Sequence, residues 1–186
     1  MPERYTRVAI AFHWFVAILI VTNVALALSW PHVADESVRP LIGNHKSIGM
    51  TVLGLAIMRL LWRLTHRPPP YPPVYARWET RLAHWVHAGL YVLMFALPLS
   101  GWIMDSAWEK AADNPNYYFG LFEWPRIAAI MALDPVTKKQ VHEGFGAAHE
   151  IAGYILYLLV FLHVAGALKH QLQGHRELAR MGVGPA

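Results

Sequence analysis

Two histidines, His149 and His163, bracket thirteen almost entirely apolar residues, and this spacing is the first sign of chemistry in the chain. In an α-helix, which rises about 1.5 Å and turns about 100° per residue, fourteen steps separate the two imidazoles by roughly 21 Å. The same steps return them to nearly the same face of the helix. Ionisable residues within an apolar span are energetically expensive and usually mark a function. Because haem iron takes axial histidines, two stacked haem groups are the sharpest hypothesis for this stretch.

The composition is typical of a membrane protein. Of the 186 residues, 55% are hydrophobic and 15% are charged, and the mean hydropathy is +0.29, which is too apolar for an ordinary soluble domain. Cysteine is absent, which excludes disulfides, thiolate-bound iron–sulfur clusters and covalent c-type haem attachment, so any haem is held non-covalently. The basic residues gather at the ends of apolar runs, so the formal net charge of +4 does not indicate nucleic-acid binding.

Four apolar runs are each long enough to cross a bilayer, and they predict an all-α integral membrane four-helix bundle that forms a single domain over residues 1–186. Between the second and third runs, residues 65–78 contain five prolines and are expected to form a stiff, extended linker. Pro98 lies within the third run, where membrane helices tolerate a kink. The four predicted spans are residues 8–29, 41–64, 79–104 and 142–170.

Residues 105–141 form the only long segment that is not apolar, and they are predicted to be an outer loop. Within it, the stretch FGLFEWPRIAAIMAL is amphipathic and is expected to lie on the membrane surface as a short helix.

The first run also has features of a cleaved signal peptide, because Arg4 and Arg7 precede it and the small-residue sequence Ala25-Leu26-Ala27 lies near its end. However, the run is long for such a segment. His13 within it would be an unusual residue in a discarded leader, so a permanent span with a ligand candidate is favoured.

The distribution of basic residues predicts the orientation of the bundle. One side of the membrane receives the N-terminus, the 65–78 linker and the C-terminus, and it carries ten basic residues against six on the other side. The positive-inside rule therefore places both termini in the cytoplasm. The ten are Arg4, Arg7, Arg59, Arg63, Arg67, Arg77, Arg81, Lys169, Arg176 and Arg180, and the six are Arg39, Lys46, Lys110, Arg126, Lys138 and Lys139.

This topology sorts the histidines by depth. His13 and His163 fall near the cytoplasmic ends of the first and fourth spans, while His45 and His149 fall near the outer ends of the second and fourth. Each pair is predicted to hold one haem b between helices. His87, in the third span, lies at a depth similar to the inner pair and is a rival ligand there.

Three other interpretations of these histidines fit the sequence less well. Zinc requires about four ligands close together, and the two pairs lie too far apart to combine. A single membrane histidine is often only a hydrogen-bonded contact between helices, but chance would rarely place four of them in two depth-matched pairs. No span shows the matched interruptions of inverted-repeat transporters. The glycines of the second span, Gly43, Gly49 and Gly54, are typical either of close helix packing or of room for a flat macrocycle.

Motifs spread over nearly the whole chain resemble one family, the small stand-alone bacterial cytochrome b561 proteins. The motifs are RYTRVAIAFHW at the start, HKSIGMTVLGLAIMRLLWRL in the second span, AHWVHAGLYVLMFALPLSGW in the third, and HE followed by the apolar run that ends at His163. The resemblance implies four helices in the bacterial inner membrane, two haems b and electron exchange with quinone. Carried over by position, it implies the axial ligands His13, His45, His149 and His163.

One member of that family is a superoxide oxidase that passes electrons from superoxide to ubiquinone, so the resemblance implies a superoxide:ubiquinone oxidoreductase. On this hypothesis four outer basic residues attract superoxide, and two histidines near the inner pair donate hydrogen bonds to the quinone. Alternatively, the two histidines contact haem propionates or lipid headgroups. The four are Arg39, Lys46, Lys138 and Lys139, and the two are His87 and His170.

Two further functions stay open at this point. Other members of the family are cytochrome b subunits of larger redox complexes, so the outer loop is a candidate docking surface for a partner dehydrogenase. The chain also fits a non-redox membrane protein with structural histidines. Four arginines near helix ends either neutralise haem propionates or anchor the helices by reaching toward the headgroups, namely Arg7, Arg59, Arg63 and Arg81.

Overall fold

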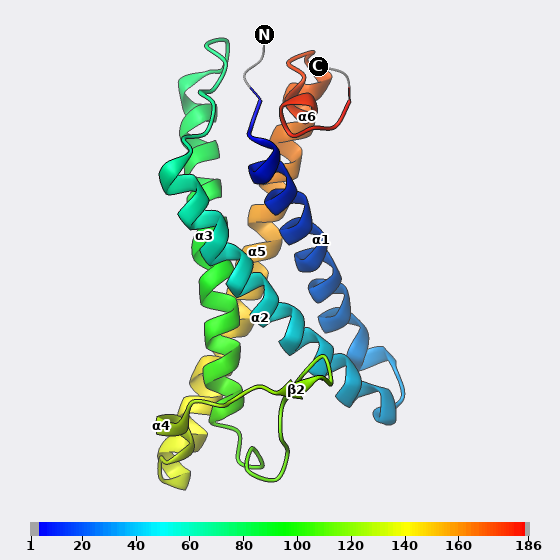
Figure 1. Ribbon diagram of the computed structural model, residues 1–186, viewed down its shortest axis with the longest axis vertical. Helices are drawn as coiled ribbons and strands as arrows, with labels where there is room; N and C mark the ends of the chain where they lie inside the picture. The colour runs from blue at the N-terminus through cyan, green and yellow to red at the C-terminus, as the bar shows by residue number, and fades with distance from the viewer. Residues whose placement is uncertain (1–3, 185–186) are drawn as a thin grey trace.

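The computed structural model describes residues 4–184 and is built from four long helices with short elements at their ends (Figure 1). All four helices are long and apolar enough to cross a membrane, in agreement with the predicted all-α membrane bundle. The long helices are α1 (Arg7–Ser29), α2 (Asp35–Thr65), α3 (Arg77–Ser106) and α5 (Pro135–Leu172). The short elements are the 3₁₀ turn η1 (Trp30–His32), strands β1 (Tyr117–Tyr118) and β2 (Phe122–Glu123), and helices α4 (Ala128–Met131) and α6 (Glu177–Arg180).

Two of the long helices begin earlier than the apolar runs that predicted them. Helix α2 starts at Asp35 rather than near residue 41. Its first turn is acidic, and negative side chains are favourable at a helix N-terminus because they interact with the helix dipole. Likewise, α5 starts at Pro135 rather than at 142, capped by the Asp134 carboxylate, which accepts hydrogen bonds from the backbone N–H groups of Val136 and Thr137 at 3.1 Å. Hydrogen bonding to Thr137 lowers the pKa of Asp134. The segment between α3 and α5 is therefore residues 107–134.

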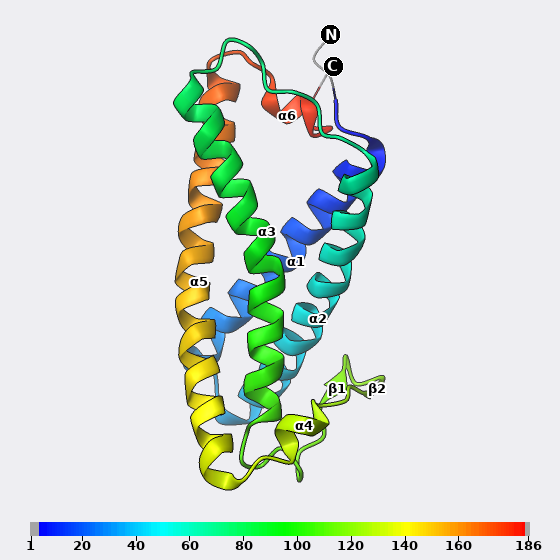
Figure 2. The same ribbon diagram turned by 90° about the vertical axis from the view of Figure 1, so that its left-hand side faces the viewer.

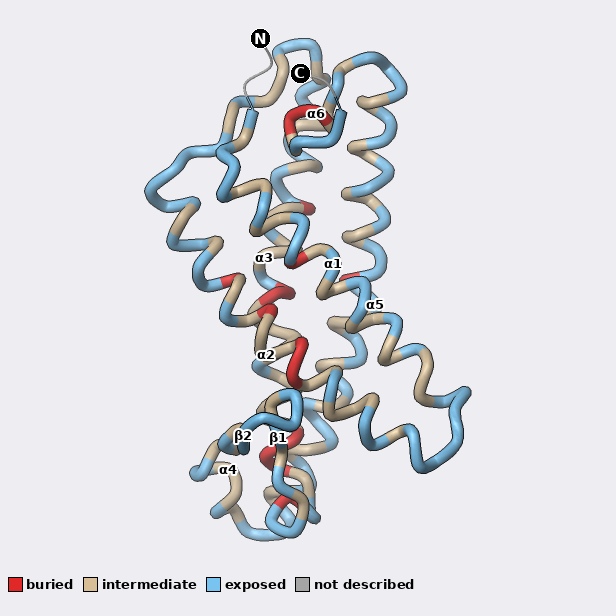
Figure 3. Tube along the Cα trace, turned by 45° about the vertical axis from the view of Figure 1, so that its right-hand side comes forward, coloured by how far each residue is buried: buried red, intermediate tan, exposed pale blue. Residues whose placement is uncertain are grey.

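The long helices pack as two pairs, α1 against α2 and α3 against α5, and α2 also packs on α3. Among the described residues, α1 and α5 make almost no direct packing contact. The main apolar core lies between α1, α2 and α3, and is shown in red in the middle of Figure 3. Its buried residues are Val16, Ile48, Val52, Ala56 and Met94.

Large apolar side chains cover the outer faces of the bundle. Ile18 and Val21 of α1, Leu61 of α2, Trp85 of α3 and Phe161 of α5 are all exposed. A soluble monomer rarely exposes apolar surface on this scale, whereas a lipid environment favours it.

The bundle has two ends of different character (Figure 2). The terminal end carries residues 4–6, the 66–76 linker and α6, so both ends of the described chain lie together, as an even number of spans requires. The loop end carries η1 and residues 107–134.

The structure corrects one expectation at the loop end. The stretch FGLFEWPRIAAIMAL is not one surface helix, because only α4 is helical and the preceding residues form the β1–β2 hairpin. Phe119 and Gly120 adopt positive φ angles of 49° and 73° within the three-residue connection between Tyr118 and Phe122, and this conformation reverses the chain. Amphipathic periodicity cannot reveal such a turn. By contrast, α3 continues as a helix through Pro98.

Candidate functional site

The pair at the loop end is formed by His45 of α2 and His149 of α5, whose ring centres lie 6.1 Å apart. His45 Nδ1 lies 3.1 Å from the backbone oxygen of Asn23 on α1, and His149 Nδ1 lies 3.0 Å from that of Leu97 on α3. Because a carbonyl only accepts hydrogen bonds, Nδ1 donates in both rings and Nε2 is left as a lone-pair ligand. Metal-binding histidines are oriented by this kind of hydrogen bond.

Two residues of α3 shape the surface against which His149 lies. Ser100 Oγ is 3.1 Å from His149 Nδ1. A Cβ atom at Gly101 would lie 3.3 Å from Cε1 of the same ring, so glycine is what allows the imidazole to approach α3 this closely. On the other side of the pair, the Trp30 ring packs edge-on against His45 at 5.3 Å.

The pair at the terminal end is formed by His13 of α1 and His163 of α5, with ring centres 5.9 Å apart. His87 of α3 is also adjacent, 5.0 Å from His163. His13 and His87 are the two candidate partners of His163, and their hydrogen bonds differ. His87 Nδ1 lies 2.6 Å from the Ala83 backbone oxygen and therefore donates, whereas His13 Nδ1 lies 3.3 Å from an Arg59 nitrogen, at the long limit of hydrogen bonding.

The distances between rings test whether a metal fits between them. A metal–nitrogen bond of about 2 Å on each side, plus about 1.1 Å from nitrogen to ring centre, sets the ring centres about 6 Å apart. The His45–His149 and His13–His163 pairs meet this value, and His87–His163 is too close. Among the described residues no group of three or more metal-ligating side chains occurs, which fails the requirement of zinc. Haem iron fits a site with only two histidines better than zinc does, because the porphyrin supplies the other ligands of the iron.

The terminal-end pair opens into a cavity of about 1160 Å³ between the helices. Two of the four predicted arginines, Arg59 and Arg63, line it and lie 5.5 Å from the centre of the Tyr91 ring. Arg59 Nε also donates to the Tyr91 hydroxyl at 3.1 Å. Arg7 and Arg81 are exposed and do not line the cavity. Two guanidinium groups beside an apolar space suit a ligand that carries carboxylates, as haem does.

The glycines of α2 do not serve close helix packing. A Cβ atom at Gly43 or Gly54 would meet no atom within 4 Å, and one at Gly49 would meet only the Asn23 side chain, at 3.9 Å. The sequence leaves two interpretations of these glycines open, close helix packing and room for a flat macrocycle. The structure agrees better with the second, because there is open space beside α2.

His170 lines the same cavity, next to Tyr75 and Glu177, which no sequence motif indicated. Its ring stacks on Tyr75 at 3.8 Å, and the Tyr75 hydroxyl donates to Glu177. Burial, reinforced by Glu177, raises the pKa of Tyr75, so this hydroxyl remains a donor. His170 Nδ1 is buried without a hydrogen-bond partner. Tyr75 and Glu177 lie in the linker and the tail, and no local pattern connects them to His170.

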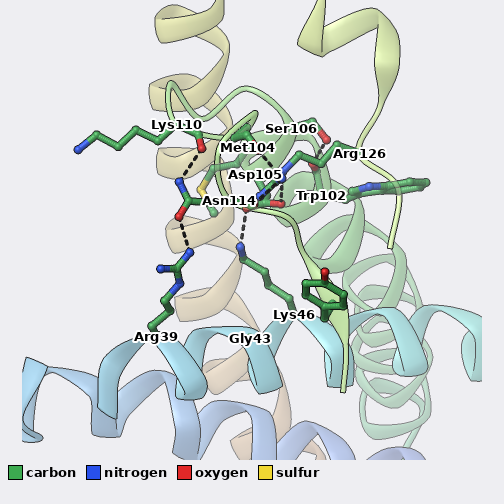
Figure 4. Close-up of polar contacts among 12 residues, drawn as sticks. Arg39, Gly43, Lys46, Trp102, Met104, Asp105, Ser106, Lys110, Asn114 and Arg126 are labelled. Carbon is green, nitrogen blue, oxygen red and sulfur yellow. Dashed lines mark hydrogen bonds and ion pairs between the residues drawn. The ribbon is translucent and has the colours of Figure 1, made fainter. Parts of the chain in front are cut away.

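The predicted anion-attracting residues Arg39 and Lys46 hold the outer loop (Figure 4). Lys46 Nζ lies 2.5 Å from Oδ1 of Asp105, whose other oxygen accepts from Arg126 at 3.0 Å. Arg39 donates to the side chain of Asn114. The other two predicted residues lie in the first turns of α5, where Lys139 pairs with Glu143 at 3.8 Å and Lys138 is half-buried.

Comparison with known proteins identifies the family. The family model described as prokaryotic cytochrome b561 matches residues 4–184. Cytochrome b561 homolog 2 of Escherichia coli K12 is 32% identical over 178 residues, which cover 91% of this chain and 85% of that protein. Cytochrome b561 homolog 1 of the same organism is 25% identical over 182 residues, covering 96% and 97%. The probable superoxide oxidase CybB of Yersinia pestis is 25% identical over 176 residues, covering 91% and 90%.

These matches agree with the site described above. Proteins of this family bind haem b and transfer electrons in the membrane, and histidines within apolar helices are suited to ligate haem iron. The chain belongs to the prokaryotic cytochrome b561 family.

Proposed function

We propose that the chain binds two haems b, one between His45 and His149 and one between His13 and His163, and carries electrons across the membrane. The observation that carries this proposal is that both pairs have the separation an iron requires, 6.1 and 5.9 Å, and that one helix contributes to both. Haem b, when bound, supplies a one-electron redox couple.

The protein contributes position and charge. Since His149 and His163 share α5, fourteen helical steps fix the two sites at roughly 21 Å along one rigid element. The Asn23 and Leu97 carbonyls orient the two rings at the loop end. At the terminal end, Arg59 and Arg63 place two positive charges beside a largely apolar cavity, where they neutralise carboxylates.

The electron donor in this proposal is superoxide at the loop end, and the acceptor is ubiquinone at the terminal end. A relative named as a probable superoxide oxidase supports the donor. Two superoxide ions each lose one electron and become dioxygen, and one ubiquinone gains two electrons and two protons and becomes ubiquinol. His87 and His170 supply hydrogen bonds at the cavity, while Lys138 and Lys139 attract the anion.

The proposed location is the bacterial inner membrane, with both termini in the cytoplasm and the loop end in the periplasm. Two observations support this orientation. Both ends of the described chain lie at one end of the bundle, and that end carries ten of the sixteen basic residues.

Haem stoichiometry tests the binding proposal. A pyridine haemochrome assay on the purified chain should give two haems b per polypeptide, and His149→Ala should retain one. His84→Ala, at an exposed histidine of α3 that does not line the cavity, is the matched control and should retain both. One haem or none in the unmodified protein would contradict the proposal.

Stopped-flow spectroscopy tests the donor and acceptor. Superoxide should reduce the haem bands rapidly, superoxide dismutase should abolish that reduction, and a water-soluble ubiquinone should restore the oxidised spectrum. If dismutase makes no difference to the rate, superoxide is not the donor. The alternative of an electron-transfer subunit then gains support if the haems are reduced only with a co-purifying dehydrogenase.

A further inference from the structure

The hairpin formed by residues 117–124 is bonded to the side of α2. The Phe119 backbone N–H donates to Ser47 Oγ at 2.9 Å, and that hydroxyl lies 3.3 Å from the Tyr117 backbone oxygen. One helical turn further along α2, Thr51 Oγ1 lies 2.9 Å from the Tyr118 hydroxyl. Ser47 is buried by this contact. The two hydroxyl residues of α2 therefore act as the attachment site for the hairpin.

Several backbone polar groups of the hairpin are paired within the protein. Leu121 N–H donates to the Tyr118 oxygen at 2.9 Å, and Trp124 N–H donates to the Asn116 oxygen at 2.7 Å, in addition to the β1–β2 pairing. Irregular backbone at membrane depth is tolerated only when its polar groups are satisfied by protein. At the turn, Ser47 satisfies the backbone N–H of Phe119.

The attachment site lies on the membrane side of the polar boundary at the loop end. The ion pairs of Asp105 with Lys46 and Arg126 mark that boundary (Figure 4). Thr51 is five residues beyond Lys46, roughly 7.5 Å further along the helix toward its middle. In Figures 1 and 2 the hairpin rises from the loop end beside the lower part of α2, on the outside of the bundle.

The tip of the hairpin presents apolar side chains that the protein does not cover. Leu121 is 77% exposed, Phe122 51%, Tyr117 49% and Phe119 42%. Phe119 also has a φ angle of 49°, a conformation in which a bulky residue is an outlier and for which Asn or Gly is preferred. The turn itself would form more readily with Asn at this position. The Phe119 ring packs edge-on against Tyr118, with ring centres 4.8 Å apart, and still leaves much of its surface exposed.

We infer that this hairpin is a membrane anchor that inserts Phe119, Leu121 and Phe122 into the outer leaflet, where these side chains contact lipid acyl chains. Glu123, at the base of the hairpin, then lies toward the headgroups. The anchor holds the 107–134 segment against α2 through Ser47 and Thr51. This assignment does not depend on the electron donor or acceptor.

The absence of cysteine makes a direct test available. Leu121→Cys and, as a matched control in the same segment, Asp113→Cys are labelled with an environment-sensitive fluorophore, and each protein is reconstituted in lipid nanodiscs. The Leu121→Cys label should be quenched by lipids that carry a spin label on the acyl chain and protected from aqueous iodide. The Asp113→Cys label should show the reverse. Equal iodide quenching of the two labels would overturn the anchor and leave the tip available to a partner protein.

A second variant separates insertion from folding. Phe119→Asn, made in the Leu121→Cys background, places a residue preferred at positive φ in the turn, so the hairpin and the haem content should be retained. Removal of the ring should nevertheless reduce the quenching of the label by spin-labelled lipid at least twofold. Unchanged lipid quenching in this variant would contradict the insertion of Phe119.

Discussion

At the scale of single residues, the two proposed haem sites differ in how their histidines are held. The rings at the loop end are oriented by backbone carbonyls of two other helices, Asn23 on α1 and Leu97 on α3. At the terminal end the spacing favours His13 as the partner of His163, while the Nδ1 hydrogen bond to Ala83 gives His87 the orientation of a ligand. A substitution can therefore distinguish the two.

Replacing each rival in turn decides which one ligates. His13→Ala should remove one of the two haems, because only the His13–His163 spacing accommodates an iron. His87→Ala should keep both haems and change mainly the rate of quinone reduction, since its ring faces the cavity. The haem-to-protein ratio and the quinone-dependent reoxidation rate are the two readouts. Loss of a haem in His87→Ala with retention in His13→Ala would reverse the assignment.

Gly101 gives a finer test of the loop-end site. A methyl group at this position would lie 3.3 Å from the His149 ring, so Gly101→Ala should displace the imidazole by a few tenths of an ångström. We expect both haems to remain bound, with a shifted reduction potential for one of them in a spectroelectrochemical titration. Gly144→Ala on α5, where a Cβ meets no atom within 4 Å, is the control. Identical potentials in Gly101→Ala and the unmodified protein would mean that this contact does not position the ligand.

At the scale of elements, α5 connects the two sites and the Asp105 cluster connects the outer loop to α2. Asp105 and Arg126 are each 8% exposed, and Lys46 is 28% exposed, so the carboxylate balances two cations in a mostly dry environment. A buried ion pair contributes little net stability while it is intact, but removal of one partner leaves uncompensated charge.

Asp105→Asn should consequently lower the thermal midpoint of the protein. The expected loss of stability is roughly 2–4 kcal/mol, reduced from the fully buried case because Lys46 keeps contact with solvent. Glu143→Gln, which disrupts the exposed Lys139 pair, should change stability by about 0.5 kcal/mol or less. Circular dichroism melts of the two variants under identical conditions provide the measurement, and similar midpoints would mean that the cluster does not stabilise the loop.

At the scale of the whole molecule, the bundle is asymmetric in charge and in shape. The terminal end gathers most of the arginines and the large cavity, and the loop end gathers the ion cluster and the hairpin. This asymmetry is consistent with the proposed carrier between different reactants on the two sides of a membrane.

The orientation can be measured with single cysteines in intact cells. Arg67→Cys, in the linker at the terminal end, should resist a membrane-impermeant maleimide until the cells are lysed. Asp113→Cys, at the loop end, should react before lysis because the outer membrane of a Gram-negative host admits small reagents. The opposite labelling pattern would place the termini in the periplasm and would move the proposed superoxide site to the wrong compartment.

The sequence alone determined the helical class, the four apolar segments and the depth of each histidine. These properties are local, because helical rise and apolar length can be counted along the chain without knowing which helices touch. The same counting placed His13 level with His163 and His45 level with His149, and the structure brings both pairs to about 6 Å. Ligation by these four residues stays a prediction that the haem assays will test.

Only the tertiary structure decided how these residues are supported. The groups that orient the loop-end rings are main-chain carbonyls, which every residue has and no sequence pattern distinguishes. Tyr75 meets His170 because the linker and the tail pack together at one end of the bundle. Phe119 adopts a positive φ angle, so the chain forms a hairpin where the sequence predicted a surface helix. Such features depend on which segments meet across the bundle, and that is fixed by packing rather than by local periodicity.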